Sequence, residues 1–157
     1  MEKPHSRKKS LILWASTLFG IGLIPYAPGT MASLAGLAVF LLVETQALFL
    51  AVTIASVILA FLLCGKAARL LGKKDPKEVV IDDFSGQLIA LLFMPKEPVY
   101  IFICFLLFRI FDTTKIPPAD IFDRKEGSLG IVGDDVVAGL YANLVVQAVR
   151  IAVNISS

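Results

Sequence analysis

The chain has very little of the residues that most metal centres and nucleophilic sites use. Its 157 residues include one histidine, His5, in a polar N-terminal tail, and two cysteines, Cys64 and Cys104, both inside apolar runs. A single imidazole excludes a phosphohistidine mechanism and a histidine-ligated metal site. No Cys and His residues have metal-ligand spacing, so the cysteines are expected to be buried apolar side chains.

Charge is also scarce. Charged residues make up 18% of the chain, below the ~25% that is usual in soluble domains. Hydrophobic residues make up 57%, and the mean hydropathy is +0.79. This composition excludes a disordered chain, a coiled coil and a disulfide-stapled secreted module. It indicates an integral membrane protein, and the length suits a single domain over residues 1–157.

The apolar runs predict an all-α membrane bundle of about five or six helices, with hairpins and a site at helix ends. Residues 34–64 are almost wholly apolar apart from Glu44-Thr45-Gln46, so they predict a helical hairpin with its tip at Glu44. The second half of this run is close to the ~20 residues that cross a bilayer. Later helices are expected over residues 76–94, from Pro98 to about 111, and from Asp134 or Asp135 to about 154, with a polar loop over 112–133.

The N-terminus resembles a signal peptide, because a basic tail over residues 1–10 precedes an apolar run over 11–18. Residues 25–28 read Pro-Tyr-Ala-Pro, which is a poor cleavage site. We therefore expect an uncleaved first helix that is amphipathic or shallowly inserted.

Basic residues gather in three clusters, at residues 7–9, 66–77 and 115–125. The predicted hairpins bring these clusters to one side of the membrane and place Glu44 and the 95–98 turn on the other side. The positive-inside rule then makes the basic side cytoplasmic.

The same topology brings carboxylates from three helix ends to the basic side. These are Asp82, Asp83, Asp112, Asp134 and Asp135, and Glu78 is expected to share a helix face with Asp82. Acids at the mouth of apolar helices are costly unless they are paired or metal-bound, and Mg²⁺ prefers oxygen ligands. The pattern predicts a Mg²⁺ site, although an N-cap role for Asp134 or Asp135 and a solvated role for Glu78 are alternatives.

Groups suited to an anion lie beside these acids. Arg109 precedes Asp112 by three residues, and Lys115 follows it by three. Residues 29–33 open a helix, where Thr30 and Ser33 accompany free backbone N–H groups. The simpler alternatives are an Arg109–Asp112 ion pair, a solvated Lys115 and an ordinary helix cap.

Two covalent phosphatase mechanisms lack their motifs. Each cysteine is followed by arginine with four residues between them, whereas cysteine phosphatases need five. Thr114 stands where an Asp-x-Asp phosphatase would have its second aspartate. Phosphoryl transfer to water activated by carboxylate-held Mg²⁺ meets neither objection.

Four motifs now identify a family. They are Pro-Tyr-Ala-Pro-Gly-Thr at 25–30 with Ser33-Leu34, Val-Val-Ile-Asp-Asp-Phe-Ser-Gly-Gln at 79–87, Phe-Arg-Ile-Phe-Asp at 108–112 with Lys115, and Gly-Ile-Val-Gly-Asp-Asp-Val-Val-Ala-Gly at 130–139. In this order and spacing, residues 20–141 resemble phosphatidylglycerophosphatase A, the Mg²⁺-dependent membrane phosphatase of bacterial phosphatidylglycerol synthesis.

The resemblance implies a multi-pass enzyme of the bacterial inner membrane with its active site facing the cytoplasm. It would hydrolyse the terminal phosphate of a phospholipid substrate, phosphatidylglycerophosphate. Asp82, Asp83, Asp112, Asp134 and Asp135 would hold Mg²⁺ and orient or deprotonate the attacking water, whereas Thr30, Ser33, Arg109 and Lys115 would bind substrate. A divalent-cation transporter or channel subunit is an alternative class. A lipid phosphotransferase is a third, although the Asp-Gly-x₂-Ala-Arg run of one large class is missing.

Overall fold

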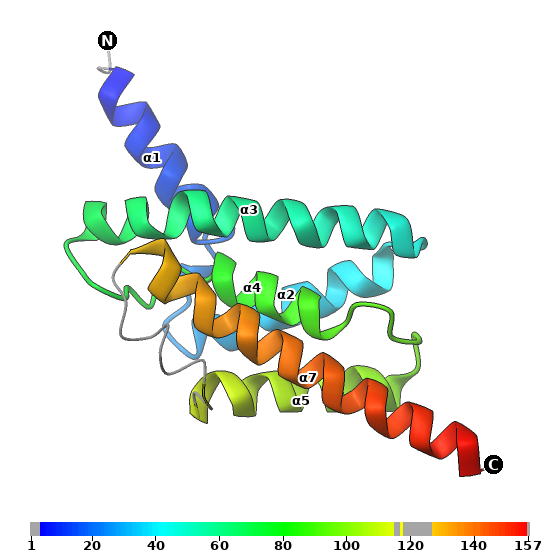
Figure 1. Cartoon of the computed structure of the whole chain (residues 1–157). Coiled ribbons are helices and arrows are strands. Elements are labelled where there is room, and N and C mark those ends of the chain that lie inside the picture. Colours follow the sequence, from blue (N-terminus) through cyan, green and yellow to red (C-terminus); the bar gives the residue numbers. More distant parts are fainter. Residues whose placement is uncertain (1–3, 115–116, 118–126, 157) are drawn as a thin grey trace.

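The computed structural model describes residues 4–114, 117 and 127–156, and all regular structure among these is helical (Figure 1). The elements are α1 (Pro4–Ser16), η1 (Ile21–Leu23), α2 (Pro28–Leu42), α3 (Gln46–Leu71), α4 (Ile81–Ala90), α5 (Pro98–Thr114) and α7 (Ser128–Ser156). The predicted all-α bundle is confirmed.

The short helix α4 lies inside the bundle and contacts α2, α3, α5 and α7 (Figure 1). Every residue of α4 except Asp83 is buried. Its closest neighbour is α7: a Cβ atom on Gly139 would lie 2.3 Å from the Gly86 carbonyl oxygen. Small residues let two helix backbones approach in this way. This contact brings the first turns of α4 and α7 to the same end of the bundle.

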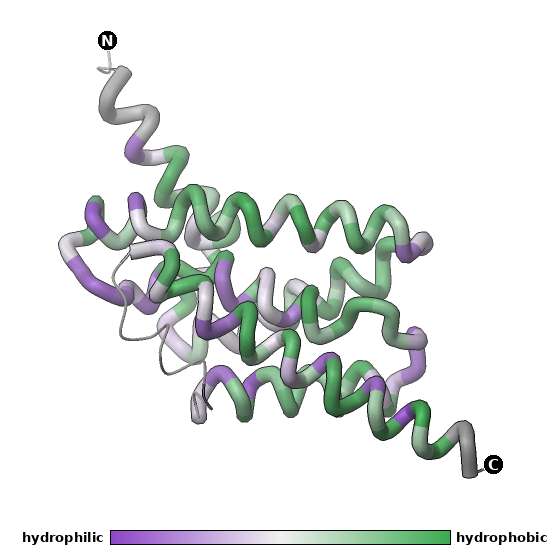
Figure 2. Tube along the Cα trace, viewed as in Figure 1, coloured by the Kyte–Doolittle hydropathy of each residue, from purple (hydrophilic) through white to green (hydrophobic). Residues whose placement is uncertain are grey.

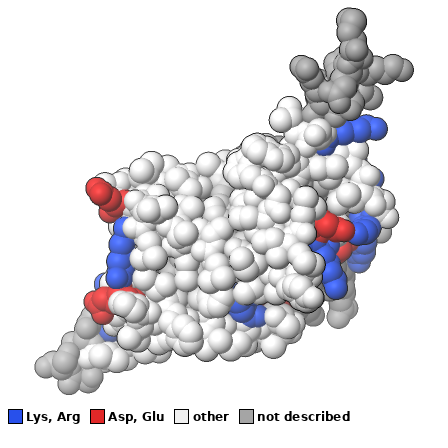
Figure 3. All heavy atoms as spheres, turned by 180° about the vertical axis from the view of Figure 1, so that it is seen from behind, with Lys and Arg blue, Asp and Glu red and all other residues white. Residues whose placement is uncertain are grey.

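The outside of the bundle is apolar. Helix α3 and residues Ser128–Val153 of α7 are long and apolar enough to cross a membrane. Hydrophobic residues run along the helices in Figure 2, and on the face shown in Figure 3 the charged side chains gather mainly at the two ends. This arrangement is that of a helical membrane protein.

The predicted hairpin tip is confirmed at Glu44, between α2 and α3. The Thr45 hydroxyl caps α3 by accepting a hydrogen bond from the Leu48 N–H at 3.3 Å. Lys96, in the turn between α4 and α5, donates to the carbonyls of Leu41 and Val43 at 3.0 and 2.8 Å. The two predicted turns therefore close the same end of the bundle, which we call the far end.

The predicted start of α4 at Pro76 is wrong, because the helix begins at Ile81. The Val79 N–H closes a turn on the Pro76 carbonyl at 2.9 Å, and the Val80 N–H donates to the Ser16 carbonyl at the end of α1 at 3.0 Å. This tertiary contact overrides the local helix signal. Glu78 consequently lies outside α4 and pairs with Lys73.

The predicted start of α7 is also wrong. The helix begins at Ser128, whose hydroxyl accepts a hydrogen bond from the Gly65 N–H of α3 at 2.8 Å. Asp134 and Asp135 therefore lie about two turns inside the helix, which excludes the N-cap alternative. The expected loop over 112–133 is helical at both of its described edges, and α1 begins inside the expected N-terminal tail.

Candidate metal and phosphate site

A cavity of about 490 Å³ opens at the end of the bundle where α4 and α7 begin. Its walls come from residues 25–30, the 75–79 turn and the nearby ends of α4, α5 and α7. The cavity brings together all five predicted aspartates, Asp82, Asp83, Asp112, Asp134 and Asp135, with Thr30 and Arg109.

Three of the aspartates form a tighter group. Each of these three residues offers one carboxylate oxygen, and the three oxygens lie within 4.8 Å of one another: Asp82, Asp83 and Asp135. Asp82 and Asp135 are only 6% and 5% exposed, and no donor in the described part of the chain reaches Oδ1 of either. Buried carboxylate oxygens without donors are costly. A hard divalent cation with oxygen ligands fits this donor set.

The electrostatics of the group lead to the same conclusion. Burial raises the pKa of Asp82 well above its usual value, and the charge of Asp83 raises it further. Burial also raises the pKa of Asp83 to about 6, although Arg109 opposes the change. The group therefore needs protons or a cation to remain buried at neutral pH.

Arg109 links this group to the rest of the cavity. Its Nη1 forms an ion pair with Asp83 Oδ1, lies 3.2 Å from Asp112 Oδ2 and donates to Ser33 Oγ at 3.4 Å. The Arg109–Asp112 pair considered from the sequence is thus present, but it is one contact of three. Asp112 lies outside the group of three and holds the guanidinium in place.

The remaining predicted site residues have different surroundings. Asp134 is buried in the cavity wall, and its Oδ1 accepts the Asp135 N–H at 3.1 Å. Ser33 is fully buried and donates to the Gly29 carbonyl at 3.0 Å, so it lies behind Arg109. Thr30 lines the cavity near the start of α2. Lys115 lies outside the described residues.

The sequence analysis did not place Lys77 in the site, and it assigned Gly29 only to the anion-binding start of a helix. Lys77 lines the cavity, whereas the sequence analysis used it only for orientation. The Asp75-Pro76 turn signal shortly before Asp82 could have identified it. Gly29 packs against Asp83: a Cβ atom there would lie 2.6 Å from both carboxylate oxygens. The sequence feature that could have indicated this role for Gly29 is the Pro28-Gly29 pair at the start of α2.

We expect Gly29→Ala to lower phosphatase activity by about tenfold or more, because the added methyl must displace a carboxylate held by Arg109. Steady-state kinetics and thermal unfolding would measure the effect. The matched control is Gly36→Ala, two turns along α2, where the new Cβ meets Gln87 methylene carbons at 3.2–3.3 Å and the Phe84 carbonyl oxygen at an ordinary 3.5 Å. Equal activity losses in the two variants would contradict a specific role for Gly29.

The family model of phosphatidylglycerophosphatase A matches residues 14–150. The chain belongs to the phosphatidylglycerophosphatase A family. This confirms the resemblance seen in the four motifs and makes the protein a member of a family of lipid phosphatases. The match includes every described residue that lines the cavity.

Similar proteins include phosphatidylglycerophosphatase A from Haemophilus influenzae, 42% identical over 137 residues (84% of each chain). The phosphatidylglycerophosphatase A of Escherichia coli is 36% identical over 126 residues, 78% of this chain and 73% of that protein. A candidate phosphatidylinositol-3-phosphatase from Bacteroides thetaiotaomicron is 34% identical over 155 residues, 92% of this chain and 96% of that protein. No solved structure matches the chain significantly.

Proposed function

We propose that this protein hydrolyses the terminal phosphate monoester of phosphatidylglycerophosphate, giving phosphatidylglycerol and inorganic phosphate in a Mg²⁺-dependent reaction. The observation that carries the proposal is the buried group of Asp82, Asp83 and Asp135, found in a chain of a lipid phosphatase family. These three residues would hold the cation. When bound, Mg²⁺ supplies positive charge that offsets phosphate charge and makes water more acidic.

The protein's own side chains supply binding and orientation. Arg109 and Lys77 offer positive charge to the phosphate from two walls of the cavity. The Thr30 hydroxyl and the free N–H groups at the start of α2 can donate to phosphate oxygens. Asp112 and Asp134 lie in the wall outside the group of three and are available to accept the proton that water loses. Water would form the new P–O bond as the P–O bond to the lipid breaks, and the proton taken up by the aspartate would pass to the departing alkoxide, giving the lipid alcohol.

The position of the acids along the bundle favours hydrolysis over cation transport. Arg150, fifteen residues after Asp135 on α7, donates to the Phe93 carbonyl at the far end at 3.2 Å. Fifteen residues of helix span roughly 22 Å, whereas the hydrocarbon core of a bilayer is about 30 Å thick. The acids thus lie toward one end of the bundle, whereas a transport site is expected near the midplane.

We further propose that the protein lies in a bacterial inner membrane with the cavity facing the cytoplasm. The supporting observation is charge, because the basic cluster over residues 66–77 spans the end of α3 and finishes at Lys77, which lines the cavity. Positive residues of this kind are retained on the cytoplasmic side.

The test is the release of inorganic phosphate from phosphatidylglycerophosphate in detergent micelles. We expect release with Mg²⁺ and none after EDTA, with restoration when Mg²⁺ is returned. Phosphatidylinositol-3-phosphate, the substrate class in the name of the Bacteroides relative, serves as the competing substrate. Release that persists in EDTA, or no release by folded protein, would overturn the proposal.

A further inference from the structure

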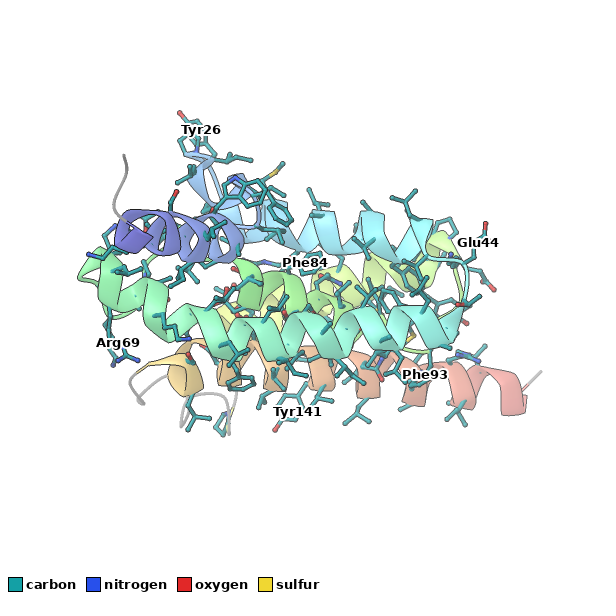
Figure 4. The ribbon with its side chains drawn as sticks, turned by 90° about the horizontal axis from the view of Figure 1, so that it is seen from above. Tyr26, Glu44, Arg69, Phe84, Phe93 and Tyr141 are labelled. Atoms are coloured by element: carbon teal, nitrogen blue, oxygen red, sulfur yellow. The ribbon has the colours of Figure 1, made fainter. Side chains whose placement is uncertain are left out.

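The segment between α1 and α2, residues 17–27, has two different faces. On its inner side, Pro25 and Ala27 line the acidic cavity. On its outer side, large apolar residues are strongly exposed: Phe19 by 64%, Leu23 by 68% and Tyr26 by 84%. Figure 4 shows Tyr26 pointing away from the bundle. We call these three exposed side chains the apolar patch; they belong to the same short segment whose Pro25 and Ala27 line the cavity.

This segment is a defined structure rather than a loose connection. Leu18, Phe19 and Ala27 have positive φ angles of 49°, 57° and 46°, a conformation that side chains other than glycine rarely adopt. Thr17 stabilises the turn, because its hydroxyl and its carbonyl accept the N–H groups of Gly20 and Gly22 at 3.2 and 2.9 Å. Unusual backbone of this kind persists only where the surrounding structure enforces it.

An apolar stripe continues from the patch along α2. Met31, Leu34 and Leu41 recur at helical spacing and are 39%, 43% and 53% exposed. Helix α2 starts in the cavity wall at Pro28 and ends near the far end, a length of roughly 22 Å. The stripe therefore leads from the phosphate site into the apolar zone of the bundle surface.

We propose that the lipid substrate reaches the cavity sideways from the bilayer, across residues 17–27. Its acyl chains lie against the stripe on α2, and Phe19, Leu23 and Tyr26 lie at the membrane interface beside its headgroup. Aromatic side chains favour this interface. The polar headgroup then crosses only the Pro25–Ala27 wall to reach Arg109 and the acids. This inference rests on the proposed function and specifies its substrate as a phosphate monoester presented by a lipid leaflet.

The kinetic test compares two substrates of the same headgroup. One is long-chain phosphatidylglycerophosphate in phosphatidylcholine vesicles that also hold the full-length protein, and the other is a short-chain, water-soluble form. We expect Phe19→Ser combined with Tyr26→Ser to lower kcat/KM for the long-chain substrate by about tenfold or more, mainly through KM. The short-chain substrate should react within about twofold of wild type.

The matched control is Phe93→Ser. Phe93 is also an exposed phenylalanine with a positive φ, 60°, but it lies toward the far end (Figure 4). It should leave both activities unchanged. Equal losses on both substrates in the double variant, or the same loss in Phe93→Ser, would overturn the access route. A wild type that hydrolyses neither substrate would instead contradict the proposed function.

A second measurement does not depend on activity. Trp14 is the only tryptophan, and its ring packs against Phe19 with centroids 4.4 Å apart. We expect its fluorescence in vesicles to be quenched by lipids brominated near the headgroup and to be protected from aqueous iodide. Quenching by iodide alone would place this segment in water and would overturn the proposal.

Discussion

Replacing Asp82 by asparagine will lower phosphate release from phosphatidylglycerophosphate by about a thousandfold or more. The substitution keeps the size of a side chain that is 6% exposed and removes one charge from the group with Asp83 and Asp135. Phosphate release with and without Mg²⁺ would measure the effect. Glu44→Gln, a similar change at the hairpin tip, should leave activity unchanged.

Thermal unfolding separates this loss from misfolding. Without divalent cation, Asp82→Asn should unfold at the wild-type temperature or above, because it removes a buried carboxylate whose Oδ1 has no donor. Saturating Mg²⁺ should raise the Tm of the wild type by about 5–10 °C and that of the variant by much less. A variant that keeps full Mg²⁺-dependent activity would exclude Asp82 from the metal site.

Replacing Arg109 by alanine will affect both activity and stability. Its guanidinium contacts Asp83, Asp112 and Ser33, so its removal leaves two carboxylates in the cavity wall without their counter-charge. Breaking a fully buried ion pair in this way costs about 3–5 kcal/mol, so a smaller cost is expected for these partly buried pairs. We expect a clear drop in Tm in EDTA and a loss of activity of about a hundredfold. Differential scanning calorimetry and phosphate release would measure the two effects.

Arg150→Ala is the matched control for this variant. Arg150 donates to the Phe93 carbonyl and lies 3.4 Å from Gln147 Oε1, far from the cavity. We expect it to keep normal activity. An Arg109→Ala protein with wild-type stability in EDTA would show that the ion pairs contribute little to the fold.

The sequence predicted which acids come together where local signals were sufficient. Adjacent acids before an apolar helix identified Asp82 and Asp83, and the Glu44 and Pro98 turns fixed which helix ends meet. Side chains along α7 complete the packing against α4: Gly139 meets Gly86, and the Asn143 amide donates to the Ala90 and Leu92 carbonyls.

The errors arose where distant contacts decide the structure. Pro76 looked like a helix start, but a turn from Pro76 to Val79 and the hydrogen bond from Val80 to Ser16 delay the helix until Ile81. Asp134 looked like a cap because the contact between Ser128 and Gly65 is not visible in the local sequence. Spacing alone indicated that Arg109 can pair with Asp112, but it could not show that Asp112 lies outside the group of three. The use of all five aspartates as metal ligands stays a prediction.

The path of the chain has a practical consequence. Helix α1 lies near the cavity end, whereas α7 runs from that end to the far end, so the two termini lie on opposite sides of the bundle (Figure 1). In the proposed orientation, a reporter protein fused before α1 would share a compartment with the substrate headgroup, and one fused after α7 would lie across the membrane from it. Purification tags on α7 would therefore leave the approach to the phosphate unobstructed.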